Sequence, residues 1–354
     1  MNIIGVMSGT SLDGLDLALC RFTKRNGRYA FSVRRAVTVP YDAAWRQRLA
    51  TVHEAGGLDL ARTDRDFGRY IGACCKSFAG TDKVDLIASH GHTVFHRPDE
   101  GLTLQIGDGA AIAAVSGIRT VADFRRQDVA MGGQGAPLVP IGDELLFGHY
   151  AACLNLGGFA NVSFRQDGRR VALDIGPFNM VFNRYAQREG LPYDDGGGLA
   201  RRGARCAALE QELDALPFYA VKGPKSLGRE WVDEVLMPLI DRHGLPPCDV
   251  LHTYSHHIAR QIAAMLPAPG MLPGSPAVPE LLVTGGGAYN RFAIGLLQEA
   301  TPYRIVIPDD YTVNYKEALI FAFLGLLRIQ GRNNTLASVT GAPRDHAGGT
   351  VFEA

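Results

Sequence analysis

The sequence has no excess of charge of either sign. Its 36 Lys and Arg residues balance 36 Asp and Glu residues, so the formal net charge at pH 7 is zero. A protein that binds nucleic acid or an anionic membrane surface needs a basic patch, and this composition does not supply one. We therefore predict neither a nucleic-acid partner nor a membrane partner.

Long hydrophobic runs are also missing. The most apolar stretch, residues 318–327, has about half of the ~20 residues that a membrane span requires. The opening MNIIG lacks the charged and apolar regions of a signal peptide. The six cysteines form no CxxC pair and no cluster at zinc spacing, so we expect free thiols in a reduced, cytoplasmic protein.

Two common nucleotide-binding signatures are absent as well. No GxxxxGK[ST] sequence occurs, which excludes a Walker loop. No GxGxxG sequence opens a helix after the first predicted strand, so a Rossmann dinucleotide site is disfavoured. A nucleotide site in this chain would need a different arrangement of backbone amides.

Glycine, by contrast, is abundant and clustered. The chain has 42 glycines in 354 residues, about 12% against a usual ~7%. Several clusters directly follow short apolar runs, a pattern typical of strands that end in ligand-facing turns. Backbone without a Cβ atom can approach a ligand closely, so these clusters indicate binding sites.

One pattern of strands and turns occurs twice. The predicted strands of the first copy are residues 2–7, 15–22 and 29–39, and those of the second are 152–156, 161–164 and 170–175. In both copies a glycine-rich turn joins the first two strands. Further strands, at 84–88, 281–284 and 304–307, alternate with helical stretches, so we predict two α/β halves related by duplication. The Pro-rich segment 267–279 predicts an irregular surface loop.

The first glycine-rich turn, GVMSGTSLDGLD at residues 5–16, suits a phosphate group. Backbone amides in this turn, together with two hydroxyl groups, form a cradle for phosphate oxygens. Asp13 would repel a phosphate unless it held Mg²⁺ or a water of that ion. A wide hairpin turn capped by serine and aspartate is the alternative. The predicted nucleotide-binding residues here are Gly9, Thr10, Ser11, Leu12, Asp13, Gly14, Leu15 and Asp16.

Two further glycine clusters extend the predicted nucleotide site. Gly157 and Gly158 stand in the second copy where the first turn stands in the first copy. Two such hairpins on opposite domains would hold a nucleotide between them. Gly285, Gly286 and Gly287 end a strand and open a helix, so their flat backbone could stack on a base or a ribose.

These motifs resemble the signatures of the anhydro-N-acetylmuramic acid kinases, sugar kinases of the hexokinase–Hsp70–actin superfold. The opening GVMSGTSLDGLD carries the resemblance, which extends nearly end to end. The other matching motifs are SHGHTVFH (89–96), ADFR (122–125), GGQGAPLVP (132–140), NLGG (155–158), PKSLGRE (224–230), TGGGAYN (284–290), KEA (316–318) and SVTGA (338–342). Motifs of this length in this order are highly specific.

The resemblance implies a fold and a set of substrates. The implied fold has two RNase H-like α/β domains related by internal duplication, with a nucleotide cleft between them. We place an N-terminal actin-like ATPase domain at residues 1–150 and a C-terminal one at 151–354, whose last helix could pack back on the first. The implied small molecules are ATP with Mg²⁺, a sugar and water. The superfold's sugar kinases often dimerise, so a homodimer is a further expectation.

The resemblance also assigns a catalytic base. The family has a motif like DTGPGN, which corresponds to DIGPFN at residues 174–179, so Asp174 is the implied base. It would activate a water that attacks C1 of the 1,6-anhydro ring, while O6 leaves C1 and attacks the γ-phosphate of ATP. The product would be N-acetylmuramate 6-phosphate, an intermediate of peptidoglycan recycling.

The position of Asp174 agrees with this role. It ends an apolar strand before a Gly-Pro turn, where a carboxylate would face a cleft. With an ordinary pKa of about 3.9 it would be ionised at neutral pH and could accept a proton from water. An aspartate that caps a helix or a turn is the alternative.

Candidate sugar-binding side chains follow two predicted strands and begin one helix. They are His90, His92, Thr93, Asp123, Arg125 and Glu317. Arg125 is the best partner for the lactyl carboxylate of the substrate. Glu317, at the start of an apolar helix predicted over 317–329, is either a first-turn dipole partner or a sugar ligand. The histidines of SHGHTVFH lack a nearby cysteine, which disfavours zinc, and we assign no residue as a metal ligand.

The sequence departs from the family pattern at several positions. Ile175, Phe178 and His92 stand where Thr, Gly and Gln are usual, and Gly142-Asp143 replaces an aromatic-His pair. These changes indicate a divergent branch, so another anhydro-sugar or a hexose is an alternative substrate. A nucleotide-dependent switch without catalysis is a third hypothesis. The retained Asp174 and the SHGHTVFH segment argue against it.

Overall fold

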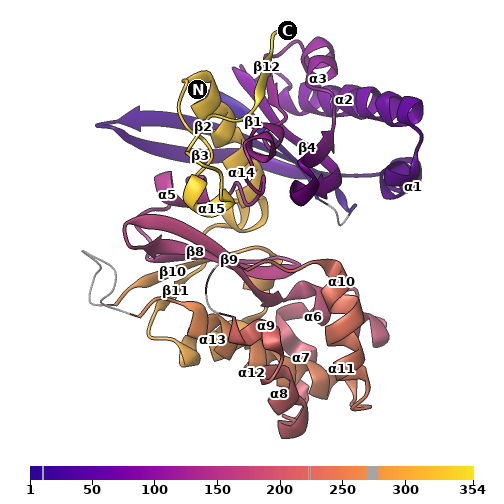
Figure 1. The fold of residues 1–354 in the computed structure, drawn as a ribbon, viewed down its shortest axis with the longest axis vertical. Coiled ribbons are helices and arrows are strands. Elements are labelled where there is room, and N and C mark those ends of the chain that lie inside the picture. Colours follow the sequence, from indigo (N-terminus) through magenta and orange to yellow (C-terminus); the bar gives the residue numbers. More distant parts are fainter. Residues whose placement is uncertain (10–11, 222, 224, 269–277) are drawn as a thin grey trace. The chain divides into compact units, whose positions relative to one another are not determined.

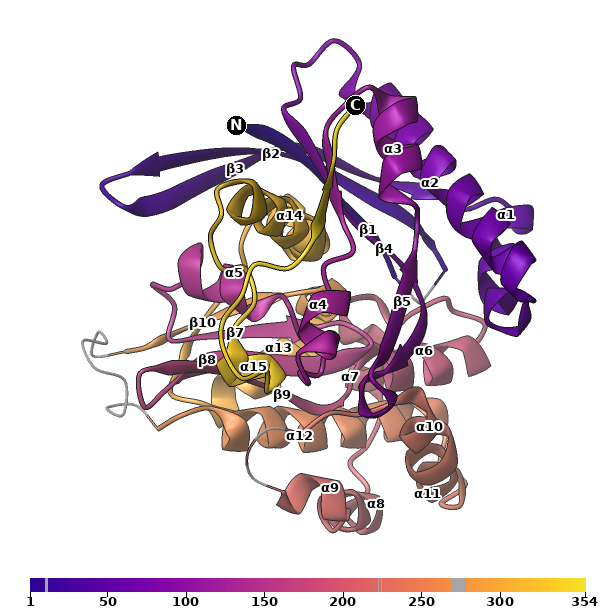
Figure 2. The same cartoon turned by 45° about the horizontal axis from the view of Figure 1, so that its top comes forward.

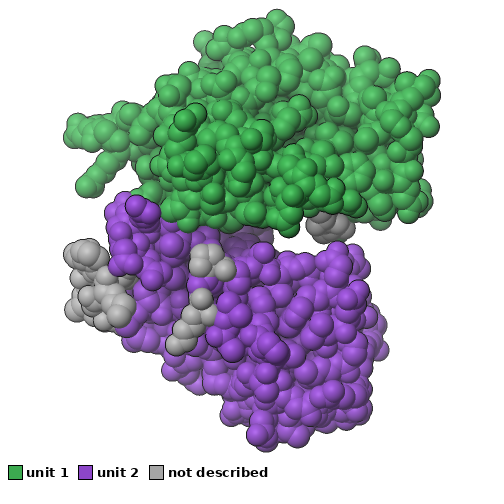
Figure 3. Space-filling model, in the orientation of Figure 1, with its two compact units in different colours: residues 1–148, 315–354 green, residues 149–314 purple. Residues whose placement is uncertain are grey.

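The chain is divided into two compact units (Figures 1 and 3). Unit 1 comprises residues 1–148 and 315–354, and unit 2 comprises residues 149–314. The structure is a computed structural model that describes residues 1–9, 12–221, 223, 225–268 and 278–354. Thr10, Ser11 and most of the predicted loop 267–279 lie outside the described residues.

Unit 1 is built on a seven-stranded mixed sheet. Its strands are β1 (Asn2–Ser8), β2 (Gly14–Arg25), β3 (Arg28–Pro40), β4 (Leu86–Arg97), β5 (Leu102–Ile106), β6 (Thr120–Ala122) and β12 (Thr350–Phe352). The order is β12-β6-β4-β1-β2-β3, with β5 paired to β4. The first hairpin is antiparallel in the register Ile3–Cys20 and Val6–Leu17, whereas β1 and β4 run parallel.

Helices cover both faces of this sheet (Figure 2). On one face α2 (Gly57–Ala79) and α3 (Gly109–Ser116) pack against the side chains of Ile4, Val6 and Ile87. On the other face lies α14 (Asp310–Ile329), whose backbone approaches β1 so closely that a Cβ atom at Gly5 would sit 1.8 Å from the Ala318 carbonyl oxygen. Glycine at this position therefore allows the helix to lie directly on the strand.

Shorter elements complete unit 1. They are α1 (Ala43–Thr51), η1 (Val52–Glu54), η2 (Pro98–Glu100), α4 (Arg126–Ala130), α5 (Pro140–Leu145) and α15 (Ala337–Thr340). The apolar helix predicted at residues 317–329 corresponds to the buried part of α14, which begins earlier, at Asp310. Within α14, Tyr315 has non-helical backbone angles, φ −121° and ψ 21°. The division between the units falls at this residue.

Unit 2 repeats the strand arrangement of unit 1. Its strands are β7 (Ala152–Leu156), β8 (Phe159–Gln166), β9 (Arg169–Pro177), β10 (Glu280–Thr284) and β11 (Arg304–Val306), in the order β11-β10-β7-β8-β9. An antiparallel meander of three strands is followed by two parallel strands on the far side of the first, as in β3-β2-β1-β4-β6 of unit 1. The predicted duplication and the predicted α/β fold class are confirmed.

Helices pack against the unit 2 sheet around one apolar core. The long ones are α6 (Asn179–Arg188), α12 (Pro247–Met265) and α13 (Arg291–Ala300). The others are η3 (Asp195–Gly197), α7 (Gly198–Arg202), α8 (Ala207–Asp214), α9 (Pro217–Ala220), α10 (Arg229–Trp231), η4 (Val232–Leu236), α11 (Met237–Asp241) and η5 (Gly286–Tyr289). The predicted helix at 178–188 matches α6.

The C-terminal segment belongs with the first sheet. The sequence analysis divided the chain at residue 150 and placed 151–354 in one domain, whereas the structure assigns residues 315–354 to unit 1. Two packing contacts account for the difference. The α14 backbone lies on β1 at Gly5, and β12 pairs antiparallel with β6 in the register Val351–Val121.

Candidate active site

The turn between β1 and β2 presents a carboxylate beside a hollow in unit 1. Leu12 has a left-handed backbone, with φ 59°, and donates its amide to the Gly9 carbonyl at 3.4 Å. Asp13 follows with an exposed side chain. Leu12 and Asp13 line a hollow of about 550 Å³ together with Arg46 and Gln47 of α1. The sequence analysis missed the last two, which no motif connects to this turn.

Asp16 of β2 is the second carboxylate near this turn. Its Oδ1 accepts a hydrogen bond of 2.6 Å from the Thr38 hydroxyl. Burial, and to a smaller degree the charge of Asp13, raises the pKa of the Asp16 carboxyl. A carboxylate whose ionised form is disfavoured by a neighbouring carboxylate is suited to bind a cation together with it.

Two of the predicted nucleotide-binding residues have structural roles. The Leu15 side chain is fully buried in the core of unit 1. A Cβ atom at Gly14 would lie 2.5 Å from the Val39 carbonyl oxygen of β3, so glycine is needed for strand pairing. These two residues can contribute only backbone atoms to a ligand.

Arg125 is held in place by two groups of unit 1. Its Nε donates to His90 Nε2 at 2.9 Å, and its Nη1 donates to the Gly135 carbonyl oxygen at 2.7 Å. His90 Nε2 is therefore the accepting nitrogen, and Nδ1 donates to the Gly91 carbonyl at 2.9 Å. Burial lowers the pKa of His90 well below its usual value, in keeping with a neutral ring. Burial also lowers the pKa of Arg125 to about 10, so its guanidinium keeps its charge.

His92 is also a buried and neutral histidine. Its Nδ1 lies 3.1 Å from the Ser8 hydroxyl, which in turn accepts a hydrogen bond of 2.8 Å from Tyr41. Burial lowers the pKa of His92 to about 4. His90 and His92 thus lie within β4, which extends past the predicted strand end at residue 88, and engage protein groups there. A direct contact of either ring with sugar stays a prediction.

Glu317 belongs electrostatically with Arg125. Solvent reaches its side chain, but the protein atoms gathered around the carboxyl raise its pKa by desolvation, and the charge of Arg125 opposes this shift. The neighbouring charge of Asp16 raises the pKa further. The backbone kink at Tyr315 places Glu317 in the first turn of the helical part that follows it, so both interpretations, a first-turn dipole partner and a sugar ligand, stay open.

The last two candidates of unit 1 are Thr93 and Asp123. The Thr93 hydroxyl accepts a hydrogen bond of 3.4 Å from Gln105. Asp123 has a left-handed backbone, with φ 61°, and pairs with Arg126 at 3.3 Å. Burial raises the pKa of Asp123. A non-glycine residue at positive φ is uncommon and often marks a functional constraint.

In unit 2 the turn at Gly157 and Gly158 is fixed to the start of α6. The amide of Phe178 donates to the Gly158 carbonyl at 2.7 Å, and the amide of Asn179 donates to the Gly157 carbonyl at 3.1 Å. The Asn179 side chain donates to Leu156. The turn is therefore a rigid connection between β7, β8 and the helix.

The third glycine cluster forms part of a pocket of about 410 Å³. Gly286 and Gly287 line it with Tyr193, Asp195, Tyr289 and Asn314. Gly285 has φ 83°, and a Cβ atom there would lie 2.8 Å from the Leu156 carbonyl group, so this glycine is required by the backbone. At Gly286 a Cβ atom would make an ordinary contact of 3.6 Å with Asn179, so this residue keeps the pocket open.

The pocket has the size and lining of a small-molecule site. Pockets for small ligands usually measure about 300–1,000 Å³ and combine flat apolar walls with a few polar groups. Tyr193 and Tyr289 are largely exposed, at 57% and 42%, and offer aromatic faces. The sequence analysis predicted the glycines but missed the tyrosines, although Tyr289 lies within the TGGGAYN motif.

Asp174 lies in β9, half-buried and hydrogen-bonded. Its Oδ2 accepts a hydrogen bond of 3.0 Å from the Leu227 amide, and its own amide donates to the Lys225 carbonyl at 2.9 Å. Burial raises the pKa of the carboxyl, and the Leu227 amide opposes this shift. The assumption of an ordinary pKa is therefore corrected upward. Because the N-cap of α6 is Phe178, the alternative that Asp174 caps this helix is wrong.

Comparisons with known proteins bear on the whole chain. A family model described as anhydro-N-acetylmuramic acid kinase matches residues 1–354. The chain belongs to the anhydro-N-acetylmuramic acid kinase family. An enzyme of this name from Azorhizobium caulinodans is 36% identical over 378 residues, covering 100% of this chain and 99% of the relative. One from Pseudomonas putida is 36% identical over 372 residues, covering 99% of each.

Membership of the anhydro-N-acetylmuramic acid kinase family confirms the predicted family and the prediction of an ATP-dependent sugar kinase. A solved structure of an activator of 2-hydroxyisocaproyl-CoA dehydratase from Clostridium difficile is 10% identical, with a TM-score of 0.46. It covers 93% of this chain and 96% of its own. Among the described residues, none of the helices combines the length and the apolar character needed to cross a membrane.

The departures from the anhydro-N-acetylmuramic acid kinase pattern lie in packed regions. Ile175 and Phe178 are each 1% exposed and belong to the apolar core of unit 2. Phe178 packs against Phe182 with the rings tilted by 39° and their centroids 4.8 Å apart. Asp143 forms a buried ion pair with Lys316 at 2.7 Å. In these positions the three side chains pack within their own unit rather than line the described pockets.

Proposed function

We propose that this chain phosphorylates 1,6-anhydro-N-acetylmuramic acid at O6 with ATP while it hydrolytically opens the anhydro ring, in peptidoglycan recycling. The observation that carries the proposal is Asp174, a half-buried carboxylate with a raised pKa, whose Oδ2 accepts a hydrogen bond from the Leu227 backbone amide. It supports a positioned general base, in a family named for this activity.

Asp174 is the proposed base for the attacking water. Its carboxylate accepts a proton as the water oxygen forms a bond to C1, and the C1–O6 bond breaks. O6 then attacks the γ-phosphorus of ATP, and the bond to the β-phosphate oxygen breaks to give ADP. A raised pKa makes the carboxylate a stronger base towards water.

Unit 1 supplies the proposed sugar contacts. Arg125 carries a full charge in a fixed orientation, which suits a carboxylate such as the lactyl group of the substrate. Glu317 is exposed and lies in the field of Arg125, so its carboxylate can accept hydrogen bonds from sugar hydroxyl groups. His90 orients Arg125, and Thr93 and Asp123 offer further polar groups.

The pocket of unit 2 is the proposed site for the nucleoside of ATP. The open backbone at Gly286 admits a flat ring, and Tyr193 and Tyr289 can cover its faces. Asp195 can accept hydrogen bonds from ribose hydroxyl groups. For the phosphate groups we propose the first turn, with Gly9 to Leu12, together with the amides at Gly157 and Gly158.

Mg²⁺ belongs to the proposal because the donor set fits it. Mg²⁺ in phosphate-transfer sites is usually bound by one or two carboxylates together with phosphate oxygens and water. Asp13 and Asp16 are close enough for the charge of one to raise the pKa of the other. Among the described residues no cluster of three or more acidic, His or Cys side chains forms a complete metal cage. Bound Mg²⁺ would neutralise charge on the phosphates.

The experiment that tests the function is an ADP-release assay on a panel of sugars. The panel holds anhydro-N-acetylmuramate, N-acetylmuramate, levoglucosan and glucose. We expect turnover with anhydro-N-acetylmuramate and water-derived ¹⁸O at C1 of the product. Turnover on N-acetylmuramate or glucose alone would refute the coupled reaction. Nucleotide binding without sugar-dependent turnover would support the switch.

A further inference from the structure

The segment 225–227 is attached to the free edge of the unit 2 sheet at Asp174. β9 is the last strand in the order β11-β10-β7-β8-β9, so one of its edges has no strand partner within this sheet. Two hydrogen bonds join the segment to this edge, from the Asp174 amide to the Lys225 carbonyl and from the Leu227 amide to Asp174 Oδ2. The orientation of the Asp174 carboxylate therefore depends on where this segment is held.

The Lys225 side chain anchors the segment. Its Nζ donates to the carbonyl oxygens of Phe218 at 2.9 Å and Val221 at 3.1 Å. The same ammonium group lies 4.2 Å from the centroid of the Phe218 ring. A lysine suits this position because one flexible side chain supplies several donors and a charge for the aromatic face. With these partners Lys225 is engaged by the protein and is not oriented as a phosphate ligand.

The helix α9, which binds the Lys225 side chain, is itself packed against the core of unit 2. Phe218 and Tyr219 belong to α9, and Phe218 packs on Trp231 with ring centroids 5.5 Å apart. Tyr219 is buried and meets the ring of His257 of α12 edge to face at 4.6 Å. The anchor of Lys225 therefore leads to the long central helix of unit 2.

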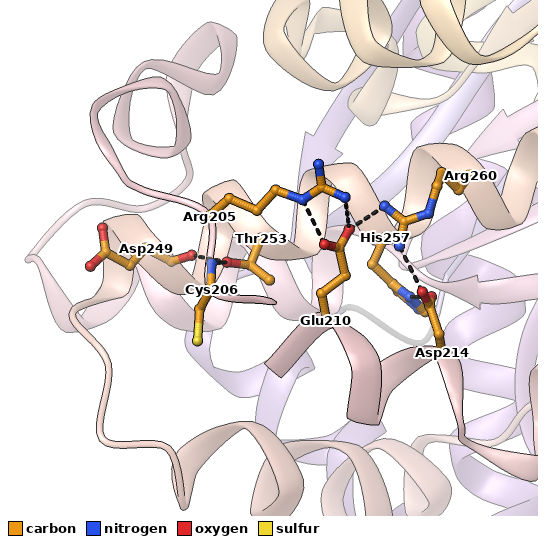
Figure 4. Close-up of polar contacts among 8 residues, drawn as sticks. All are labelled: Arg205, Cys206, Glu210, Asp214, Asp249, Thr253, His257 and Arg260. Carbon is orange, nitrogen blue, oxygen red and sulfur yellow. Dashed lines mark hydrogen bonds and ion pairs between the residues drawn. The ribbon is translucent and has the colours of Figure 1, made fainter. Parts of the chain in front are cut away.

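An ion-pair network connects α8, the helix before α9 in the chain, to α12 (Figure 4). The Glu210 carboxylate accepts hydrogen bonds from Arg205 and Arg260, and the Asp214 carboxylate accepts them from His257 at 2.7 Å and Arg260 at 2.7 Å. Glu210 and Asp214 lie on α8, directly before α9 in the chain. The ion pairs thus hold α8 against α12, and the contact between Tyr219 and His257 holds α9 against the same helix.

We propose that Lys225 is a positioning residue for Asp174, which holds the segment 225–227 so that the Leu227 amide keeps the carboxylate directed at the water. The inference rests on the proposed role of Asp174 as the base. Lys225 touches neither the reacting atoms nor the substrate in this assignment. It acts through the Leu227 amide and the edge of β9.

The test is the pH dependence of kcat in the full-length enzyme with Lys225→Met. Methionine keeps most of the stem but loses the donors and the charge. The Leu227 amide lowers the pKa of Asp174, so its loss should move the acid limb of the kcat profile to higher pH. We expect kcat at neutral pH to fall about tenfold, as for the loss of one hydrogen bond to a charged group, with KM for ATP unchanged.

Two further variants make the test specific. Lys225→Arg keeps a charge and several donors for the two carbonyls, and should restore most of kcat and the wild-type limb. Phe218→Leu removes the aromatic ring that the Lys225 ammonium contacts. It should move the acid limb of the kcat profile in the same direction as Lys225→Met, but by less. Arg229→Met is the matched control, because it removes an exposed charge from α10, directly after the segment, where Arg229 pairs with Asp233 at 3.4 Å.

The outcomes separate this inference from the proposed function. If Asp174→Asn keeps its turnover, the base assignment itself fails. If Asp174→Asn is inactive but the Lys225→Met and Phe218→Leu profiles superimpose on the wild type, only the positioning role of Lys225 is refuted. An equal loss of kcat in Lys225→Met and Arg229→Met, with no movement of the acid limb, would likewise contradict it.

Discussion

The two sheets share one strand order but differ in the side chains around their first hairpin turns. In unit 1 the turn carries Asp13, with Asp16 close by in β2, and Arg125 and Glu317 lie in the same unit. In unit 2 the equivalent turn is Gly157-Gly158, fixed by backbone hydrogen bonds to α6. The charged residue of interest there is Asp174, in the third strand of the meander.

The difference shows how a duplicated fold can divide a reaction. The same strand order places a turn between the first two strands of each sheet. The residues in that turn then decide what it can bind. Unit 1 has the charges that suit a sugar acid and a cation. Unit 2 has the glycine-lined pocket and the candidate base. Substitutions in the two units should therefore affect different kinetic constants.

The largest effect is expected for Asp174→Asn, which should lower kcat without changing either KM. A positioned general base contributes about 10²–10⁴-fold to rate, and the amide cannot accept the proton from water. ADP release measures kcat, and calorimetry measures ATP binding. Asp167→Asn, an exposed residue of the β8–β9 turn at φ 50°, is the control that should leave both unchanged. Loss of ATP binding in Asp174→Asn would instead assign Asp174 to nucleotide binding and contradict its role as the base.

The second prediction concerns the stability of unit 1. Lys316→Met leaves the buried Asp143 carboxylate without its ion-pair partner, whose side chain is 5% exposed. Removal of one member of a buried pair usually costs about 3–5 kcal/mol. Hydrogen exchange should show faster exchange in α5 and the 315–329 part of α14, with unit 2 unchanged. The double variant Lys316→Met with Asp143→Leu should recover part of the loss, and uniform loosening of both units would contradict the assignment.

Much of the fold follows from the sequence because apolar strands bounded by glycine are local signals. The strand predicted at residues 152–156 has the observed bounds of β7, and that at 2–7 misses one residue of β1. The start of α14 was missed because the apolar run begins at residue 318. The residue that marks the start of this helix is polar and lies earlier. Asp309 accepts hydrogen bonds from the Thr312 amide at 3.1 Å and from the Thr312 hydroxyl at 2.9 Å, as an N-terminal cap does.

The site was predictable in part. The glycines of the third cluster could be singled out because they directly follow a strand, and Asp174 could be singled out because it stands in the DIGPFN motif that carries the family resemblance. Tyr193 and Asn314 could not be, since distant segments bring them to Gly286 only in the folded chain. Lys225 lay in a noted motif, PKSLGRE, but the sequence does not show that it is attached to the edge of β9. Burial, which raises the pKa of Asp174, is likewise a property of the packed structure.

A third prediction tests the sugar side through Arg125→Lys. Lysine keeps the charge but not the planar fork that donates both to His90 and to Gly135. The KM for the sugar should rise about 10- to 100-fold, the usual range for one or two charge-assisted hydrogen bonds, with KM for ATP unchanged. Arg119→Lys, an exposed residue paired with Glu353, is the control. An equal rise in KM for the sugar and in KM for ATP would contradict the assignment of sugar binding to unit 1 and of ATP binding to unit 2.

The smallest effect is expected for Gly286→Val, the counterpart on the nucleotide side. Its Cβ atom makes an ordinary contact, so the remaining methyl groups would enter the pocket of about 410 Å³ without disturbing the backbone. Overpacking of this kind costs about 1–2 kcal/mol, so KM for ATP should rise about tenfold while KM for the sugar stays constant. Gly295→Val is the matched control, because a Cβ atom at this exposed position of α13 meets no atom within 4 Å of the described structure. A change in KM for the sugar instead would show that the pocket of unit 2 holds the sugar, and the comparison between the units would be reversed.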